Sequence, residues 1–369
     1  MKVVFITLNL GKGGAEKVFT TLVKSLNNVF EIHVVSIHSG GYYEKEIMNT
    51  NVNYYTLGGP DGNTFNYVVR FGKLIKKINP DVVISFLWYP NIISGLAAFF
   101  SKTKLIVSER SNHRIYLKEN FKKKFLWKNI LKLVYGKANL IIPNSVKMGE
   151  NIITDFKVNP DKVKVIHNGI DFEKIDGLAN EIINDFDFKK NIKYLMALGR
   201  LDEPKNYSML LKSFKILSDR NSNVELLIIG DGLLKDKHFE EAKTLGIIEK
   251  VHFVGFKSNP YKYLKKADCY VMSSKIEGFP NALIEAMYIT GKVVSTNCET
   301  GPDEIITNDE DGFLVRVDDY QQMAESIEKI LYDNELQSKF YNNSRKKIKT
   351  FGKDKMIEKF ERYIYEVGH

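Results

Sequence analysis

Two glutamates eight residues apart frame a short turn that contains glycine and proline. Glu277 opens the sequence EGFPNALIE and Glu285 closes it. Pro280 suits the first position of a helix, so we expect Glu277 in the preceding loop and Glu285 inside the helix. Backbone N–H groups at a helix start attract anions, whereas a carboxylate repels phosphate and accepts hydrogen bonds from hydroxyls. A nucleotide sugar carries both groups and suits this segment; a surface turn with an unrelated glutamate is the alternative.

A second charged segment reads GRLDEPKN and follows an apolar run. Arg200 presents a planar guanidinium and Lys205 a compact ammonium, and together they suit a diphosphate. A solvated loop with unrelated charges is the alternative.

A glycine-rich segment, GKGGAE, follows the first apolar run. Glu16 stands where the dinucleotide-binding fingerprint requires its third glycine, and the lysine–serine pair of a P-loop is missing. The segment therefore does not favour a dehydrogenase or a P-loop nucleotidase. Gly13 and Gly14 still allow a backbone to approach a ligand closely, and a tight turn without a ligand is the alternative.

Length and composition limit the classes of protein to which the chain can belong. The chain has 369 residues, which is enough for two domains, and 44% of them are hydrophobic. No apolar run is long enough to span a membrane, and the N-terminal run lacks the features of a secretory signal. Two cysteines cannot form a disulfide framework, which favours a reducing cytoplasm, and no Cys/His cluster predicts a metal site.

The positive charge is concentrated in one half of the chain. Residues 1–173 contain 24 Lys and Arg against 13 Asp and Glu, whereas the remainder contains 30 against 32. A basic half indicates a polyanionic partner, such as a membrane surface, a nucleic acid or a phosphorylated substrate.

Short apolar runs alternate with helical patterns along the chain, which predicts two α/β domains with doubly wound parallel sheets. We expect them to face each other across a cleft, with ligands beyond the carboxyl ends of the strands. An irregular stretch at 169–191 separates the two series, and residues 355–367 form an amphipathic helix. The predicted strands are Val3–Leu8, Ile32–Ile37, Val82–Phe86, Leu105–Val107, Leu140–Ile142, Tyr194–Leu198, Val224–Ile229, Val251–Val254, Cys269–Met272 and Val293–Ser295.

Several motifs in one order resemble glycosyltransferase family 4. They are GGAEKV, ISFL, SERSN, GRLDEPKN, the GDG turn, EGFPNALIEA, and TGPDEII followed by DGFLV. The resemblance covers nearly the whole chain and is strongest to bacterial enzymes that build lipid-linked or surface glycans. It implies the GT-B fold, with two Rossmann-like domains and a C-terminal helix that returns to the first. It also implies a retaining glycosyltransferase that needs no metal or other cofactor.

The resemblance assigns roles to the motif residues. Arg200 and Lys205 would hold the donor diphosphate and stabilise the leaving nucleotide, and Glu277 would bind the donor sugar near the reacting carbon. These three are the predicted catalytic residues. Glu285 would bind the ribose. The remaining predicted donor-binding residues are Gly13 and Gly14 from the opposite domain, Phe256 and Lys257 near the base, and Gly278, Phe279, Pro280 and Asn281 around the sugar and phosphates.

The acceptor side departs from the family pattern. Many members carry a histidine where this chain has Arg110, and His113 follows three residues later. Arg110 stays protonated and cannot act as a base, but it suits a phosphate of the acceptor or donor. His113 is either an acceptor-side residue or a surface-loop histidine. The sequence identifies no general base, which a front-face retaining mechanism tolerates because the leaving phosphate can accept the proton.

A basic amphipathic stretch, KENFKKKFLWKNILKLVYGK, occupies residues 118–137. Its apolar face would hold Phe121, Phe125, Ile130, Leu131 and Val134, with lysines beside it and Tyr135 at the interface. This pattern is typical of a helix on an anionic membrane; an ordinary helix packed on the sheet is the alternative. The predicted membrane contacts are Lys122, Lys123, Lys124, Trp127 and Lys128.

These observations predict a cytoplasmic enzyme bound peripherally to the inner face of a bacterial cell membrane. It would move a hexose or N-acetylhexosamine from a nucleotide sugar, for which we expect a UDP-sugar, to a lipid-linked or oligosaccharide acceptor in capsule, lipopolysaccharide or similar glycan synthesis. Residues 1–170 with 355–369 would form the acceptor-binding, membrane-facing domain, and 190–350 the nucleotide-sugar domain. The alternatives are a GT-B sugar-nucleotide epimerase, a non-catalytic basic binding protein, and a nucleic-acid-binding protein, for which no recognised module is present.

Overall fold

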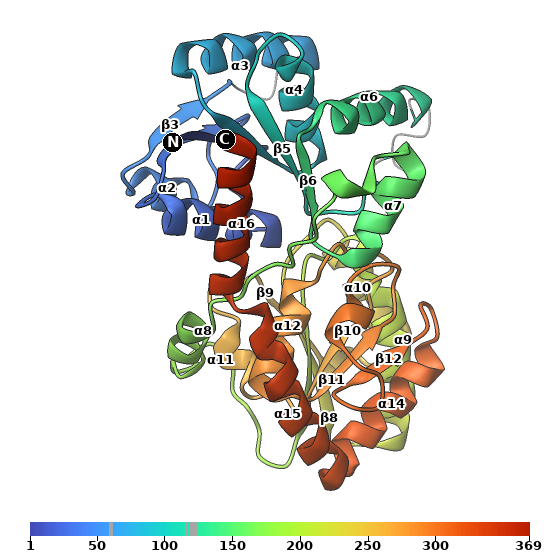
Figure 1. Cartoon of the computed structure of the whole chain (residues 1–369). Coiled ribbons are helices and arrows are strands. Elements are labelled where there is room, and N and C mark those ends of the chain that lie inside the picture. Colours follow the sequence, from blue (N-terminus) through green and yellow to red (C-terminus); the bar gives the residue numbers. More distant parts are fainter. Residues whose placement is uncertain (59–61, 115–116, 118–123) are drawn as a thin grey trace. The chain divides into compact units, whose positions relative to one another are not determined.

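The computed structural model describes residues 1–58, 62–114, 117 and 124–369. The chain divides into two compact units (Figure 1). Unit 1 comprises residues 1–169 and 353–369, and unit 2 comprises residues 170–352. The predicted second domain began at residue 190, but unit 2 already includes α8 (Phe172–Ala179), whose Ile175 is buried in its core. The stretch predicted as irregular therefore contains a helix.

Unit 1 is built on a six-stranded parallel sheet with the order β3-β2-β1-β4-β5-β6. Successive residues of a strand point to opposite faces, so Val4 and Ile6 join one core while Val3 and Phe5 join the other. Helices α3, α4, α6 and α7 cover the first face, and α1 and α16 cover the second. The strands are β1 (Lys2–Thr7), β2 (Glu31–Ser36), β3 (Asn53–Thr56), β4 (Val82–Phe86), β5 (Lys104–Glu109) and β6 (Leu140–Pro143). The helices are α1 (Gly14–Leu26), α2 (Glu44–Met48), α3 (Thr64–Ile78), α4 (Trp88–Ala98), α6 (Lys124–Lys137), α7 (Val146–Phe156) and α16 (Lys353–Gly368).

Unit 2 repeats the same topology, with the order β12-β11-β10-β7-β8-β9. Its strands are β7 (Lys193–Leu198), β8 (Val224–Ile229), β9 (Val251–Gly255), β10 (Cys269–Met272), β11 (Val293–Thr296) and β12 (Phe313–Val315). Its other helices are α9 (Tyr207–Arg220), α10 (Lys235–Thr244), α11 (Tyr261–Leu264), α12 (Asn281–Thr290), α13 (Pro302–Ile305), α14 (Tyr320–Tyr332) and α15 (Asn334–Ile348). In each sheet the order reverses beside the first strand, between β1 and β4 and between β7 and β10. Such switch points are where open α/β sheets bind ligands.

All ten predicted strands are present, and the two that the sequence did not predict, β3 and β12, lie at the edges of the sheets. The helix predicted at 355–367 is α16, which packs on unit 1 through Met356, Phe360 and Ile364. The return of this helix to the first domain is confirmed.

The basic helix α6 differs from its predicted orientation. Leu131, Val134 and Tyr135 are buried, so part of the expected membrane face belongs to the core, as the alternative interpretation proposed. Trp127 packs edge-on against Trp88 of α4, with ring centroids 5.7 Å apart. Phe125 remains 82% exposed. Lys124 and Lys128 are exposed, whereas Phe121, Lys122 and Lys123 lie outside the described residues.

None of the helices in the described part of the chain combines the length and apolar character needed to cross a bilayer.

Candidate active site

The switch point of unit 2 brings two predicted motifs together. Arg200 and Lys205 lie in the segment that follows β7, and Glu277 lies in the loop that follows β10. Strands β7 and β10 are parallel neighbours, so their carboxyl ends lie side by side at one edge of the sheet. The topology therefore explains how residues distant in sequence reach one site.

Lys205 and Glu277 form the centre of this site. Nζ of Lys205 lies 2.6 Å from Oε1 of Glu277, and the same oxygen accepts a hydrogen bond of 2.6 Å from the Ser274 hydroxyl. The side chains of Lys205 and Glu277 are 26% and 11% exposed, so both are largely screened yet still reach solvent. The pair places a cation and a carboxylate in position to meet a phosphate and a sugar hydroxyl, respectively.

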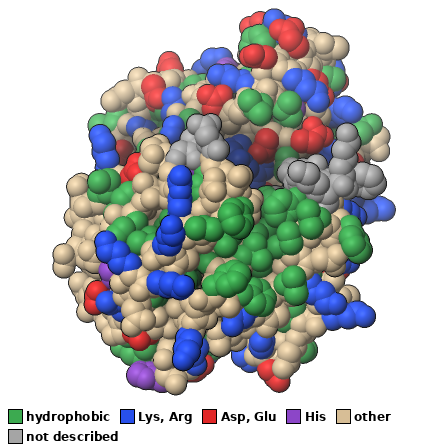
Figure 2. Space-filling model, turned by 90° about the horizontal axis from the view of Figure 1, so that it is seen from above, with side chains coloured by type: hydrophobic (Ala, Val, Ile, Leu, Met, Phe, Trp, Pro, Cys, Tyr) green, Lys and Arg blue, Asp and Glu red, His purple; other side chains and the backbone are tan. Residues whose placement is uncertain are grey.

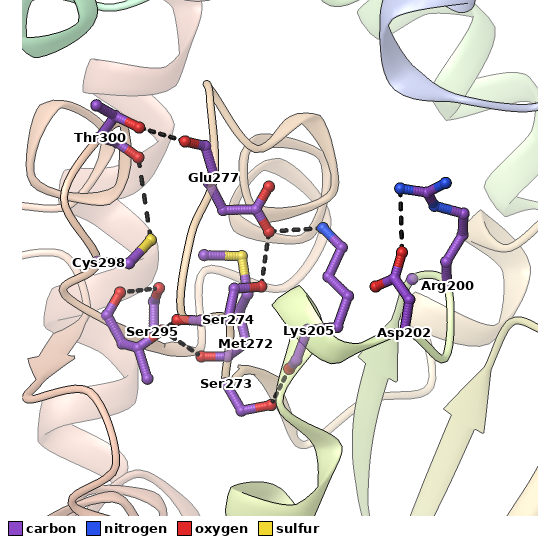
Figure 3. A network of polar contacts seen from close by, with 12 residues as sticks. Arg200, Asp202, Lys205, Met272, Ser273, Ser274, Glu277, Ser295, Cys298 and Thr300 are labelled. Carbon is purple, nitrogen blue, oxygen red and sulfur yellow. Dashed lines mark hydrogen bonds and ion pairs between the residues drawn. The ribbon is translucent and has the colours of Figure 1, made fainter. Parts of the chain in front are cut away.

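Hydroxyl groups of neighbouring residues hold the backbone around this pair (Figure 3). The Ser273 hydroxyl donates to the Lys205 carbonyl at 2.9 Å, and the Thr296 hydroxyl donates to the Ser274 carbonyl at 2.6 Å. The Thr300 hydroxyl donates to the carbonyl of Glu277 itself. Because Thr296 ends β11 and Thr300 follows it, a third strand helps to position the Glu277 loop.

Arg200, unlike Lys205 and Glu277, is largely exposed to solvent. Its side chain is 79% exposed, and its guanidinium pairs with Asp202 at 3.1 Å. An arginine held at its own loop by one carboxylate and otherwise exposed can turn toward an anion without breaking a buried contact.

Glycines pack the GDG turn directly against this loop. Gly230 has a φ of +151°, and a Cβ there would lie 1.9 Å from the carbonyl oxygen of Gly199. A Cβ on Gly232 would lie 2.5 Å from the carbonyl oxygen of Leu201. Only glycine permits such close approach with that backbone conformation. The amide of Leu201 bonds to the Asp231 carbonyl at 3.0 Å, which fixes the two turns together.

The segment after Glu277 forms the start of α12. Helix α12 begins at Asn281, so Pro280 precedes the first helical residue instead of occupying that position, and its carbonyl accepts the first helical bonds. Phe279 is buried and packs on Phe351, so only its backbone is suited to line a ligand pocket. Gly278 lies against the turn at Gly301, because a Cβ on Gly301 would lie 3.1 Å from the carbonyl oxygen of Gly278.

Glu285 lies inside α12, as predicted, and is 5% exposed. One of its oxygens accepts a hydrogen bond of 3.2 Å from the Tyr261 hydroxyl. This bond holds the carboxylate in one orientation, which is what a ribose-binding residue requires.

The other predicted donor residues occupy loops or a helix start. Phe256 is 42% exposed after β9, and Lys257 forms an ion pair of 2.5 Å with Asp185. In unit 1, Gly13 immediately precedes α1 and Gly14 is its first residue. A Cβ on Gly13 would lie 2.3 Å from Oε2 of Glu16, so the helix start is already faced by a carboxylate.

Arg110 is buried in unit 1, although it was predicted to meet a substrate phosphate. It is 5% exposed and lies between the rings of Phe86 and Phe360, 5.2 Å from each centroid. It donates to the Ser108 hydroxyl at 2.8 Å, the Ile166 carbonyl at 3.1 Å and the Asn168 side chain at 3.0 Å. Burial lowers the pKa of Arg110 to about 9. In this structure it joins β5 to α16.

His113 is fully buried, so the surface-loop interpretation was wrong. Its Nε2 lies 2.8 Å from Oδ2 of Asp155, to which Arg114 also donates at 2.8 Å. Burial would raise the pKa of Asp155, but the bonds from Arg114 and His113 outweigh it and lower the pKa to about 2. The histidine therefore anchors the segment that follows β5 to α7.

Sequence reasoning missed a buried carboxyl beside Arg110. Glu109 ends β5 and is 0% exposed; its Oε1 accepts hydrogen bonds from Tyr135 at 2.7 Å and Asn91 at 2.8 Å. Burial raises the pKa of Glu109 to about 7. Asn91 in turn accepts from the Ser85 hydroxyl at 2.6 Å. A signal was available, because Glu109 comes only two residues after the predicted apolar strand Leu105–Val107.

The described residues contain no group of three or more His, Cys, Asp or Glu side chains arranged to hold a metal ion.

Two Rossmann-like units of identical strand order are the two halves of the GT-B fold. Residues 12–174 match the family described as "Glycosyltransferase Family 4", and residues 179–347 match "Glycosyl transferases group 1". The chain belongs to glycosyltransferase family 4.

Named relatives agree with this assignment. The chain is 32% identical to the N-acetylgalactosamine-N,N'-diacetylbacillosaminyl-diphospho-undecaprenol 4-alpha-N-acetylgalactosaminyltransferase of Campylobacter jejuni, over 96% of this chain and 97% of that protein. It is 31% identical to the GalNAc-alpha-(1->4)-GalNAc-alpha-(1->3)-diNAcBac-PP-undecaprenol alpha-1,4-N-acetyl-D-galactosaminyltransferase of the same organism, over 100% and 99%. The structure of Anabaena HepE in complex with UDP-glucose superposes with a TM-score of 0.81 at 18% identity, covering 99% and 100% of the two chains.

Proposed function

We propose that the protein transfers a hexose or N-acetylhexosamine from a UDP-sugar to a glycan linked through a diphosphate to a lipid. The pairing of Lys205 with Glu277 at the switch point of unit 2 carries this proposal. A donor nucleotide sugar has phosphates for the cation and hydroxyls for the carboxylate. The HepE complex with UDP-glucose supports the donor class, and the names of the two Campylobacter relatives support the acceptor class.

In the proposed reaction, Lys205 and Arg200 stabilise the negative charge that develops on the leaving diphosphate, so no metal is required. Glu277 accepts hydrogen bonds from the donor sugar and orients its anomeric carbon. The acceptor oxygen attacks the same face that the nucleotide leaves, and the leaving phosphate takes the acceptor's proton. The anomeric configuration is thereby retained without a protein base.

We further propose that unit 1 binds an anionic membrane through the apolar face formed by α3, α4, the turn after α4, and α6. Figure 2 looks onto the end of unit 1 that carries these helices and shows hydrophobic side chains gathered there with Lys and Arg around them. Helices α3, α4 and α6 contain eight Lys and Arg residues and no Asp or Glu. The exposed apolar side chains of α3, α6 and the turn after α4 are Phe65, Val69, Phe99, Phe100, Phe125, Leu126 and Leu133.

Charge and apolarity together favour a lipid surface over another partner. Aromatic side chains enter the boundary between headgroups and acyl chains, and lysines beside them attract anionic headgroups. Phe100 is 75% and Phe65 73% exposed, values that are unusual for phenylalanine in water. A lipid-linked acceptor would be presented at this surface.

A donor screen tests the proposed chemistry. Wild type and Glu277→Ala are incubated with a panel of nucleotide sugars in EDTA, and both thermal stabilisation and nucleotide release are measured. We expect a UDP-sugar to stabilise the wild type and to release UDP slowly, with release lost in the variant. A strict requirement for Mn²⁺ or Mg²⁺ would refute the metal-free mechanism.

The same assay separates the transferase from a sugar-nucleotide epimerase. An epimerase would change the sugar of the nucleotide without any acceptor, so product analysis by chromatography would show a second UDP-sugar. A transferase would instead release UDP faster when an extract of lipid-linked glycans is added.

A further inference from the structure

A cavity in unit 1 lies where β1 and β2 end. Its volume is about 400 Å³, and its lining includes Asn9, Lys12, His38 and Tyr42. Both strands are parallel, so the loops that follow them lie together at the carboxyl edge of the sheet, where α/β folds bind ligands. The cavity is large enough for one or two sugar rings, at the lower end of small-molecule sites, which begin at about 300 Å³.

The two loops that form this cavity are fixed to each other. The amide of His38 donates to the Leu8 carbonyl at 2.9 Å, and the amide of Tyr43 donates to the Leu10 carbonyl at 2.8 Å. A Cβ on Gly41 would lie 2.3 Å from the carbonyl carbon of Leu10, so the backbones touch. The cavity is therefore built into the fold and does not depend on the closing of a loop.

The lining chemistry is that of a carbohydrate site. Tyr42 is 49% exposed and offers an aromatic face, and Nζ of Lys12 lies 5.8 Å from the centre of its ring. Asn9 and Ser39 supply an amide and a hydroxyl, and none of the described residues that line the cavity carries a carboxylate. Within the described residues, the buried Nδ1 of His38 has no hydrogen-bond partner. Apolar ring faces for C–H groups and polar groups for hydroxyls match the two surfaces of a sugar.

A phosphate fits this cavity less well. Among the described residues of its lining, Lys12 is the one Lys or Arg. The adjacent start of α1 is faced by the Glu16 carboxylate, which would lie 2.3 Å from a Cβ on Gly13. A carboxylate at the positive end of a helix neutralises the charge that would attract an anion. The neutral part of a ligand is therefore the better occupant.

We propose that this cavity binds a sugar ring of the acceptor glycan, with Tyr42 as the stacking platform and Asn9, Lys12, His38 and Ser39 as hydrogen-bonding groups. The inference rests on the proposed function, and it places acceptor recognition away from Arg110 and His113, both of which are buried and engaged elsewhere. Tyr42 and His38 thus become determinants of which glycan is extended.

Binding of simple glycosides tests the site without requiring the natural acceptor. Methyl α-glycosides of N-acetylgalactosamine, galactose and glucose are added at millimolar concentration, and saturation-transfer NMR is recorded on the wild type, Tyr42→Ala and His38→Ala. We expect saturation transfer to at least one glycoside in the wild type, and its loss or roughly tenfold weakening in Tyr42→Ala. Tyr332→Ala is the matched control, because Tyr332 is 47% exposed, also lies near a lysine and belongs to unit 2.

Three results would overturn the inference. Glycoside signals that survive both substitutions would place sugar binding elsewhere, and the absence of any glycoside signal in the wild type would leave the cavity without a sugar ligand. Displacement of the glycosides by inorganic pyrophosphate, with the same loss in Tyr42→Ala, would identify an anion site instead. The donor screen measures a different property, namely stabilisation by UDP-sugars, which we assign to unit 2. A negative glycoside result would therefore refute the sugar site in unit 1 without refuting the proposed transferase activity.

Discussion

Nζ of Lys205 lies 2.6 Å from Oε1 of Glu277, although 72 residues separate them in the chain. The pair is possible because the strands that precede these residues, β7 and β10, are neighbours in the sheet. Each side chain balances the charge of the other. In the proposed reaction, an incoming diphosphate replaces the carboxylate as the partner of Lys205, which leaves Glu277 to accept hydrogen bonds from the sugar.

Replacement of Lys205 by alanine should lower kcat about 10²-fold or more, the effect of removing one group that stabilises developing negative charge. Steady-state kinetics with the donor identified by the screen would measure it. Lys215→Ala is the control, because Lys215 also forms an ion pair of 2.6 Å, with Asp219, on the exposed side of α9. Equal kcat in Lys205→Ala and wild type would remove Lys205 from the mechanism.

Replacement of Glu277 by glutamine should separate catalysis from nucleotide binding. The amide oxygen of the glutamine can still accept a hydrogen bond from the Ser274 hydroxyl, but the negative charge that repels phosphate is removed. We expect kcat to fall while UDP binds at least as tightly as to the wild type, as measured by calorimetry. Weaker UDP binding in this variant would show that Glu277 acts chiefly by holding Lys205 in place.

Glu109 should make stability depend on pH. Burial raises its pKa from 4.5 to about 7, so between these values the folded protein binds more protons than the unfolded chain. The free energy of unfolding should therefore fall as pH rises through this window, since the buried carboxyl must ionise. Glu109→Gln resembles the protonated carboxyl and should flatten this dependence in denaturant titrations at several pH values.

The comparison needs a control for general charge effects. Glu150→Gln serves, because Glu150 is exposed on α7 and pairs with Lys147 at the surface. That variant should retain the wild-type pH dependence. Identical pH profiles for Glu109→Gln and the wild type would mean that Glu109 is ionised throughout the window in the folded state.

The apolar face of unit 1 should bind anionic vesicles through two separable contributions. Phe100→Ser with Phe125→Ser should weaken binding at all salt concentrations, because burial of aromatic area is insensitive to screening. Glu substitutions at Lys124, Lys128 and Lys132 should weaken binding mostly at low salt. Sedimentation with phosphatidylglycerol-containing vesicles would measure both.

Lysines of unit 2 provide the matched control for this experiment. Glu substitutions at Lys235, Lys237 and Lys243, all on α10, change the net charge equally but lie outside the apolar face. They should leave vesicle binding nearly unchanged. Equal losses from both sets of substitutions would show that net charge, and no particular surface, governs the association.

The sequence predicted the fold because buried parallel strands are continuous apolar runs. The strands it missed lie at the sheet edges, where burial is partial or the strand is short: β3 reads NYYT with both ends exposed, and β12 has three residues. The proximity of Lys205 and Glu277 also followed from the sequence, since each motif comes after an apolar run that forms a strand.

The acceptor side could not be predicted in the same way. Arg110 and His113 are polar residues that follow an apolar strand, and sequence alone favours solvent or ligand for such residues. Their burial depends on partners from distant segments, namely Phe360 on α16 for Arg110 and Asp155 on α7 for His113. The exposed Phe125 and buried Val134 of α6 show the same limit, because a helical pattern with apolar residues on several sides does not say which side the core will take.

The packing of α16 on unit 1 implies an order of events during synthesis. Phe360 completes the ring cluster that includes Phe86, and it covers Arg110, yet the ribosome delivers it after the whole of unit 2. Unit 2 is one uninterrupted segment and can reach its native state while unit 1 still exposes the apolar groove that α16 will fill. The nascent chain should therefore acquire a protease-resistant unit 2 first, and unit 1 should need protection by a chaperone until α16 has been synthesised.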